Sequence, residues 1–305
     1  MTAPSSTVRN IAAFITVSLI WGSTWLVIKD QISAIPPGWT VTWRFTGAAV
    51  GMCLLTLVRG ESLRMPREGL RLAAVIGLLQ FCGNFQLVYR AEHYVASGLV
   101  AVLYALLMVP NALLARVMLG TRLQARFLIG SGVAMGGIAL LMMHEYRGGQ
   151  GDVVTGVLFT LGGILCASAS NVLQATETGR RQAVVPLITW AMIFGAVIDA
   201  GLAYGMYGAP VLDPHPRYWA GVAYLAIAGS VITFPVYFAL IRAIGPGRAA
   251  YSNVVVPVVA MALSTLFEGY RWTGLAVAGS VVVMAGLLIA LSGRASVAKP
   301  ARNDG

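Results

Sequence analysis

The sequence predicts an all-α integral membrane protein in which ten transmembrane helices form two inverted five-helix repeats around a central cavity. The first observation behind this prediction is composition: hydrophobic residues make up 58% of the 305 residues and charged residues only 10%. A soluble domain carries roughly 25% charged residues. The second observation is a series of long apolar segments, and the third is a set of matching residues in the two halves. We therefore expect a single transmembrane domain over residues 1–305.

A helix needs about 20 apolar residues to cross the hydrocarbon core of a bilayer. Ten segments of suitable length and composition follow one another along the chain, at about Ile11–Ile28, Trp39–Val58, Leu70–Val88, Val95–Leu119, Phe127–Met143, Val153–Gln174, Val184–Tyr207, Tyr218–Ile241, Ala249–Phe267 and Trp272–Leu291. The first segment could pass for a signal peptide, but the apolar segments that follow it favour a retained first helix. The connections are short, so no soluble domain is expected.

The basic residues predict how the helices are oriented. An even number of spans places both termini on one side of the membrane, and fifteen of the 21 Lys and Arg residues fall on that side, against five on the other. Loops rich in Lys and Arg stay in the cytoplasm. We therefore expect both termini, including the tail 295–305, to be cytoplasmic. Arg44 is the one basic residue left inside a span.

The two halves of the chain contain matching residues at one fixed offset. The motif "YALLMVP" in the fourth span corresponds to "YSNVVVP" in the ninth, with glycines at equal distances: the pairs are Tyr104 and Tyr251, Pro110 and Pro257, Gly98 and Gly245, and Gly132 and Gly279. This register predicts repeats over about 9–145 and 152–294. Because each repeat has an odd number of spans, the second copy is inverted. Inverted repeats are typical of alternating-access carriers with a substrate site near the bilayer midplane.

Polar and aromatic residues near the middle of several spans are candidates for the wall of that cavity. Trp21 is the clearest, because tryptophan in membrane helices favours the water interfaces rather than the centre. The full set is Trp21, Ser23, Thr24, Asn84, Gln86, Tyr104, Ser168, Ser170, Asn171, Trp190, Tyr237, Tyr251 and Asn253. An amino-acid site needs dipoles for the charged backbone groups and aromatic or apolar walls for the side chain. Hydrogen bonding between packed helices is the alternative role for each of these residues.

Ionisable residues within membrane spans are costly and mark candidate functional sites. Arg44 either holds a substrate carboxylate or gates an outer vestibule, or else its side chain snorkels to the surface or pairs within the protein. Asp199 either pairs with a neighbouring helix, with Arg44 as one candidate partner, or takes up a proton during transport. Glu268 lies at an outer boundary, where it acts in coupling or gating or simply caps a helix.

Four prolines fall inside predicted spans, where each removes a backbone hydrogen bond. They are candidate hinges, with static kinks as the alternative: Pro110, Pro186, Pro235 and Pro257.

Several classes of function are disfavoured. The three cysteines are isolated within apolar segments, which predicts neither a metal site nor a cofactor: Cys53, Cys82 and Cys166. The histidines fall in predicted exterior loops, so no buried Ser–His pair is expected for an intramembrane serine protease: His93, His144 and His215. The net charge of +10 lies in short loops and so predicts orientation rather than nucleic-acid binding. Charged rings or filter loops, which are typical of channels, are not evident.

The chain also resembles a known family. The residues that carry the resemblance are "LIWGSTWLVIK" in the first span, Arg44 in the second, the proline-containing fourth span that runs into "LGTRL", and "VVVPVVAMALSTLFEGYRWTG" in the second half. Together they resemble the EamA family of the drug/metabolite transporter superfamily over about Ile11–Leu291, and most of all its bacterial inner-membrane exporters of aromatic amino acids. Where the first half of the family often has an acidic residue, this chain has Thr121, although Glu268 is kept. A mechanism that needs a symmetric acidic pair is therefore weakened.

The resemblance implies ten helices and the export of amino acids or related metabolites. We predict an inner-membrane alternating-access carrier for aromatic and other neutral amino acids, acting as a monomer or weak homodimer in the lipid bilayer. Export of drugs or other small metabolites is the alternative. Arg44 as the only basic residue within a span favours a singly charged or zwitterionic substrate over a nucleotide sugar. Proton antiport, exchange and facilitated diffusion all remain open.

Overall fold

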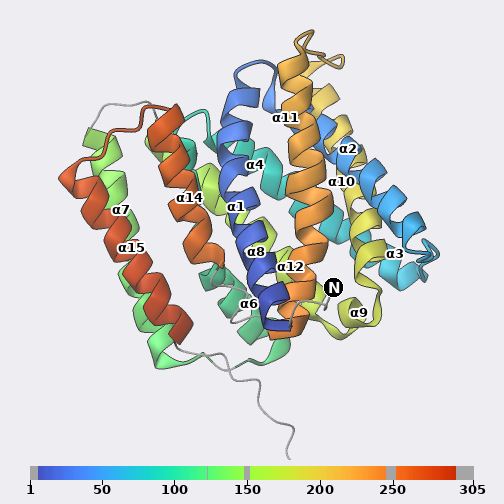
Figure 1. Cartoon of the computed structure of the whole chain (residues 1–305), viewed down its shortest axis with the longest axis horizontal. Helices are drawn as coiled ribbons and strands as arrows, with labels where there is room; N and C mark the ends of the chain where they lie inside the picture. The colour runs from blue at the N-terminus through green and yellow to red at the C-terminus, as the bar shows by residue number, and fades with distance from the viewer. Residues whose placement is uncertain (1–5, 122, 148–151, 245–251, 293–305) are drawn as a thin grey trace, which may run out of the picture.

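The computed structural model describes residues 6–121, 123–147, 152–244 and 252–292, and within these ranges every regular element is a helix. The elements are α1 (Ser6–Ile32), α2 (Pro37–Val58), α3 (Arg67–Ile76), η1 (Gly77–Asn84), α4 (Phe85–Ala91), α5 (Ser97–Tyr104), η2 (Ala105–Leu107), α6 (Met108–Leu119), α7 (Ala125–Arg147), α8 (Val153–Ala175), α9 (Glu177–Arg181), α10 (Val184–Tyr207), α11 (Pro216–Ala226), η3 (Ile227–Ile232), α12 (Thr233–Ile244), α14 (Ser252–Phe267) and α15 (Gly274–Ser292). Figure 1 shows them as a bundle of long rods.

Several short elements join end to end into single rods. We number the rods after the ten predicted segments, so that the third rod consists of α3, η1 and α4, the fourth of α5, η2 and α6, and the eighth of α11, η3 and α12. The first, sixth and ninth rods are α1, α8 and α14. Seven of the described rods are long and apolar enough to cross a membrane, and three shorter apolar stretches occupy the fifth, ninth and tenth predicted segments: Ala125–Leu141, Val255–Phe267 and Gly274–Ala290. The chain is thus an all-helical membrane protein, and α1 begins at the same end of the bundle at which α15 ends (Figure 1).

Proline and glycine mark several ends of these rods. Pro37 and Pro216 begin α2 and α11, where the missing backbone N–H would have had no intrahelical partner. Gly120 follows α6 with a φ of 68°, and Gly208 follows α10 with a φ of 74°. These left-handed conformations suit glycine and reverse the chain direction.

Two of the rods contain a π-helical segment. In the third rod, η1 spans Gly77–Asn84, and in the eighth, η3 spans Ile227–Ile232. Such segments are rare and frequently lie at functional sites, because they rotate side chains and free backbone groups from the regular pattern. Each π segment turns part of its surface to the interior of the bundle, where Gln80, Phe81 and Asn84 of η1 and Gly229 and Ser230 of η3 are buried.

Glycine allows the closest packing between helices. The α7 and α15 rods lie side by side (Figure 1), and a Cβ added at Gly137 would lie 2.5 Å from the backbone nitrogen of Val283. Across the bundle, a Cβ added at Gly22 of α1 would lie 2.5 Å from Cβ of Val259 in α14. Small residues let membrane helices approach in this way. At Gly22 the close neighbour is therefore another helix, α14.

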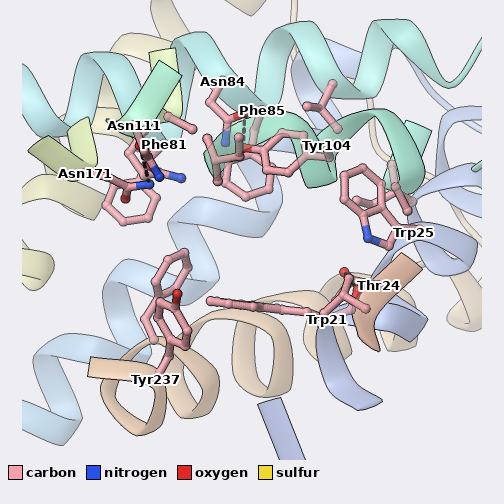
Figure 2. A pocket seen from close by; sticks show the side chains of 18 of the residues that line it. Trp21, Thr24, Trp25, Phe81, Asn84, Phe85, Tyr104, Asn111, Asn171 and Tyr237 are labelled. Atoms are coloured by element: carbon pink, nitrogen blue, oxygen red, sulfur yellow. Dashed lines mark hydrogen bonds between the residues drawn. The ribbon is translucent and has the colours of Figure 1, made fainter. Parts of the chain in front are cut away.

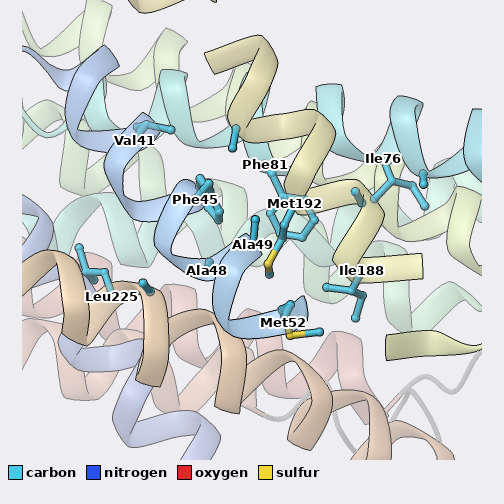
Figure 3. Close-up of a cluster of buried hydrophobic side chains, with 14 of the residues drawn as sticks. Val41, Phe45, Ala48, Ala49, Met52, Ile76, Phe81, Ile188, Met192 and Leu225 are labelled. Carbon is cyan, nitrogen blue, oxygen red and sulfur yellow. The ribbon is translucent and has the colours of Figure 1, made fainter. Parts of the chain in front are cut away.

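A large apolar cluster joins α2 to α10 and to the third and eighth rods (Figure 3). Its centre contains Phe45 and Met52 of α2, Phe81 of η1, Met192 of α10 and Leu225 of α11. Large apolar side chains also lie exposed on the outside of the bundle, including residues of α2, α8 and α10: Val50, Leu54, Leu158 and Val197. In a bilayer these outer faces contact lipid, and the buried cluster fixes one wall of the cavity described next.

Candidate functional site

A cavity of about 160 Å³ lies in the middle of the bundle. Residues from α1, α2, the third and fourth rods, α8, α10, α12 and α14 line it (Figure 2). Eight of the residues singled out from the sequence are among them: Trp21, Thr24, Arg44, Asn84, Tyr104, Asn171, Tyr237 and Pro257. The lining therefore draws on both halves of the chain.

The Trp21 indole forms one wall of this cavity. Its ring packs against Tyr237 with centroids 4.9 Å apart and against Phe234 at 5.6 Å. Its Nε1 donates a hydrogen bond to the carbonyl oxygen of Gly229, at 3.3 Å. Gly229 belongs to η3, so the π segment supplies the acceptor that a buried indole needs. Trp21 is thus held in place by the eighth rod while its ring remains on the cavity surface (Figure 2).

A second aromatic pair adjoins a cluster of amides. Trp25 packs against Tyr104 with centroids 5.4 Å apart, and the Tyr104 hydroxyl donates a 2.8 Å hydrogen bond to Oδ1 of Asn84. Asn171 of α8 donates to Oδ1 of Asn111 of α6 at 3.5 Å. These side chains place neutral donors and acceptors against aromatic walls, a combination suited to small polar ligands with an apolar part.

Gln80 of η1 adds an acceptor that no protein group uses. Its side chain lines the cavity, and its Oε1 is buried and lacks a hydrogen-bond partner in the described part of the chain. A buried acceptor without a hydrogen bond costs free energy of folding. In a binding cavity, such an acceptor is available to a donor group of the ligand. Because Gln80 and Asn84 are four residues apart in the π segment, they present their amides to the same region.

Arg44 brings a positive charge to the cavity. Its side chain is only 2% exposed, so the prediction that it snorkels to the surface is wrong. Nη1 donates to the Tyr89 hydroxyl at 3.1 Å and Nη2 to Oγ of Ser230 at 3.5 Å. The guanidinium carbon lies 4.5 Å from the ring centroid of Phe85 and 5.1 Å from that of Phe45, distances that allow cation–π attraction.

No carboxylate compensates this charge at close range. Among the described residues, Arg44 forms no ion pair within 4.0 Å, and its Nε also lacks a hydrogen-bond partner. The pairing considered between Arg44 and Asp199 does not occur. Asp199 is fully buried and instead accepts a 2.8 Å hydrogen bond from Nε2 of Gln86. Asp199 therefore joins α10 to α4 and does not line the cavity.

Five other residues predicted at the cavity do not line it, because their side chains face neighbouring helices or loops. Gln86 is held by Asp199, and Ser23 shares a 2.6 Å hydrogen bond with the Tyr224 hydroxyl. Ser168 donates to the carbonyl of Leu107 at 3.3 Å, and Trp190 donates to the carbonyl of Leu63 at 2.8 Å. Oγ of Ser170 is buried and has no hydrogen-bond partner among the described residues. Tyr251 and the side chain of Asn253 lie outside the described residues.

Glu268 occupies the predicted outer boundary and caps a helix of the other half. Its Oε2 accepts hydrogen bonds from the backbone nitrogen of Ser97 at 3.2 Å and from Oγ of Ser264 at 3.0 Å. The Ser97 hydroxyl also bonds to Oε1. A carboxylate at the start of a helix is favourable because the first N–H groups there lack partners. Glu268 thereby ties the end of α14 to the start of α5.

The prolines divide into two groups. Pro257 lies inside α14 and lines the cavity. Pro110 and Pro235 follow η2 and η3, where an α-helical piece takes over from a differently wound one. Pro186, by contrast, is the third residue of α10, where a backbone N–H has no intrahelical partner in any case. Pro186 therefore removes no intrahelical hydrogen bond, contrary to expectation, whereas the other three prolines lie inside continuous rods.

Sequence reasoning missed three amides and four aromatic residues that line the cavity: Gln80, Asn111, Gln174, Trp25, Phe81, Phe85 and Phe234. The sequence contains a signal for two of them. Gln80 lies four residues before Asn84, and Asn111 directly follows Pro110, both inside apolar segments.

A bundle of apolar helices that encloses a cavity of amides, aromatic rings and one buried cation defines a membrane transporter. The chain belongs to the EamA-like transporter family, whose model matches residues 9–143 and again residues 154–292. The family is part of the drug/metabolite transporter superfamily, and its name and those of the relatives indicate a transporter rather than an enzyme.

Relatives with similar sequences are bacterial membrane proteins. The chain is 29% identical to the uncharacterized inner membrane transporter YedA of Escherichia coli (strain K12), over 94% of this chain and 92% of that protein. It is 24% identical to a protein of Salmonella typhimurium named probable amino-acid metabolite efflux pump, over 91% and 93% of the two chains. A solved crystal structure matches with a TM-score of 0.67 and 21% identity, over 95% of this chain and 99% of its own, and shows the fold alone.

Proposed function

We propose that this transporter exports aromatic and other neutral amino acids, and related metabolites, from the cytoplasm across the inner membrane by alternating access. The observation that carries the proposal is Arg44, a buried cation that lines a cavity of amides and aromatic rings and has no counter-ion within 4.0 Å among the described residues. A substrate carboxylate supplies the missing negative charge and accepts charge-assisted hydrogen bonds. The aromatic walls suit an apolar or aromatic side chain.

The ammonium group of the substrate has neutral acceptors available. Among the described residues that line the cavity, none is an Asp or Glu. The unpaired Oε1 of Gln80 and the amide oxygens of Asn84 and Asn111 therefore take that role. This arrangement favours a zwitterion or an anion over a cation. The Salmonella typhimurium relative, whose printed name refers to amino-acid metabolite efflux, supports the same substrate class.

Internal symmetry supports the alternating-access part of the proposal. The family model matches the chain twice, and the third and eighth rods both contain a π segment. In two five-span repeats, the first rod is equivalent to the sixth and the fourth to the ninth. Accordingly, the first rod (α1) packs on the ninth (α14), and the sixth rod (α8) packs on the fourth (α5 and α6). We therefore assign ten spans in two inverted repeats, with both termini cytoplasmic on the basis of the basic loops. A monomer or weak homodimer suffices, since both repeats are in one chain.

The test is flux through purified protein in liposomes. Labelled phenylalanine should exchange against internal phenylalanine, and a panel of unlabelled neutral amino acids should compete. Arg44→Gln is the matched variant, because it removes the charge and keeps a polar group. Flux or competition by cationic drugs, with none from the amino-acid panel, would overturn the substrate and favour drug export, the alternative in this superfamily.

A further inference from the structure

Glu92 is a buried acid that none of the preceding roles uses. It is the first residue after α4 and lies one turn beyond Val88, which lines the cavity. Its side chain has no exposed surface, and both carboxyl oxygens are buried without a hydrogen-bond partner in the described part of the chain. An ionised carboxylate in such a place lacks both water and donors, so burial strongly favours the neutral, protonated form.

The charged groups around Glu92 come from three other elements. Lys29 of α1 approaches most closely, but its Nζ bonds to the backbone carbonyls of Glu92 and Val95, and it forms no ion pair with the carboxyl group within 4.0 Å. Arg44 of α2 and Glu268 after α14 act from farther away. Burial raises the pKa of the Glu92 carboxyl well above its ordinary value, against the opposing effects of Lys29 and Arg44, while Glu268 raises it further.

The neighbouring histidine does not replace Glu92 as a proton site. Burial lowers the pKa of His93, and the positive charges of Lys29 and Arg90 lower it further. His93 is therefore neutral near pH 7, and its charge cannot stabilise an ionised Glu92.

Four residues, which we call the Glu92 cluster, close this end of the bundle: Lys29, Glu92, Ser97 and Glu268. Lys29 ties the end of α1 to the segment between α4 and α5, and Glu268 ties the end of α14 to the start of α5. The cluster thus joins elements of both halves. Any motion that opens this end of the cavity has to separate these elements and admit water to Glu92.

We propose that Glu92 is a proton-binding site, which takes up a proton when this end of the bundle closes and releases it when the end opens. The proposal rests on the alternating access proposed above. The open state exposes the carboxyl group to water and restores its ordinary acidity, so closing consumes a proton. The ratio of closed to open molecules therefore rises as the pH falls, by up to about tenfold per pH unit above the ordinary acidity of glutamate.

A cysteine at Val95 reports on the opening without any substrate. Val95 lies within the closing segment and is 4% exposed, and Val185 at the start of α10 is equally buried at the opposite end of the bundle. Each is replaced by cysteine in full-length protein whose native Cys53, Cys82 and Cys166 have been removed. The rate of labelling by a water-soluble thiol reagent is measured from pH 6 to pH 8 in detergent.

The readout is the Val95→Cys labelling rate divided by the rate for the same reporter in a Glu92→Gln background, which cancels the pH dependence of the thiol. We expect this ratio to rise at least about tenfold from pH 6 to pH 8. The Val185→Cys ratio should not rise, because in alternating access the opposite end does not open together with the Glu92 end. Glu177→Gln, an exposed glutamate of α9, should behave like the parent.

A constant Val95→Cys ratio over this range would overturn the proposal. If Glu92→Gln does not fold, the Val95→Cys rate divided by the Val185→Cys rate in the parent must still rise with pH, and a constant quotient would have the same consequence. Because no substrate is added, failure here is distinct from failure of the amino-acid flux assay.

Discussion

Replacing Arg44 by glutamine tests the carboxylate site directly. The guanidinium group has five N–H donors, and the protein engages one on Nη1 and one on Nη2. The remaining Nη donors are free for a substrate carboxylate. One hydrogen bond to a charged group contributes about 1.5–3 kcal/mol, so its loss should weaken binding roughly 10- to 150-fold.

The assay compares two inhibitors of labelled phenylalanine exchange in proteoliposomes: phenylalanine itself and phenylalaninol, in which a neutral hydroxymethyl group replaces the carboxylate. In the parent protein, phenylalanine should inhibit at a concentration at least about 10-fold lower than phenylalaninol. In Arg44→Gln this difference should disappear. Arg44→Lys is the second variant, and we expect only partial recovery, because lysine keeps the charge but loses the planar fork that stacks on Phe85.

The thermal unfolding midpoint distinguishes a substrate-binding role of Arg44 from a purely structural one. Arg44 is a buried cation without a close counter-ion in the described structure, so a neutral residue should leave the thermal midpoint unchanged or raise it. An unfolding midpoint that falls sharply in Arg44→Gln, together with unchanged discrimination between phenylalanine and phenylalaninol, would refute the reasoning. Arg44 would then serve only to hold Tyr89 and Ser230.

Three further substitutions have definite expected outcomes. Trp21→Phe keeps a ring but removes the hydrogen bond to Gly229, so exchange should slow several-fold while unfolding free energy falls by only about 1 kcal/mol in a denaturant or thermal assay. Gly137→Leu should severely reduce the yield of folded protein because its Cβ would meet the α15 backbone, whereas Gly136→Leu, with open space around it, should be tolerated in size-exclusion profiles. Gln80→Leu removes an unpaired buried acceptor, so stability should hold or rise while competition by amino acids weakens relative to their des-amino analogues.

The helices were predictable because a membrane imposes a minimum length of apolar sequence, and each predicted segment coincides with a helix or a continuous rod. Which face a residue presents was less predictable. Trp21 and Ser23 are two residues apart, yet the first lines the cavity and the second contacts Tyr224. The direction of side chains in the third rod was the hardest to predict. The π segment η1 changes the number of residues per turn, on which any prediction of the buried face depends. Gln86, expected at the cavity because it is polar and near mid-span, contacts Asp199 instead, and Gln80 was missed.

Arg44 and Glu92 show a different limit. The depth of Arg44 in its span can be read from the sequence, but that its guanidinium lies over the rings of both Phe85 and Phe45 depends on how the third rod packs on α2. Glu92 falls in a short connection that would ordinarily be solvated. Its burial arises because α1 and the end of α14 close over the segment, and contacts between elements so far apart in the chain leave no local pattern.

The proposals for Arg44 and Glu92 together link the affinity for substrate to the opening of the Glu92 end. A cation held about 6 Å from an uncompensated guanidinium is repelled by roughly 2.8 kcal/mol at an effective dielectric constant of 20, and an anion is attracted equally. While the Glu92 end is closed, the neutral acid leaves the charge of Arg44 free for a substrate carboxylate. Opening ionises Glu92, whose negative charge acts on Arg44 and competes with the substrate. Binding energies are linked reciprocally, so the opening that releases a proton also weakens the hold on the carboxylate. Glu92→Gln should therefore bind substrate more tightly from the outer side and release it more slowly, and an unchanged release rate would separate the two sites.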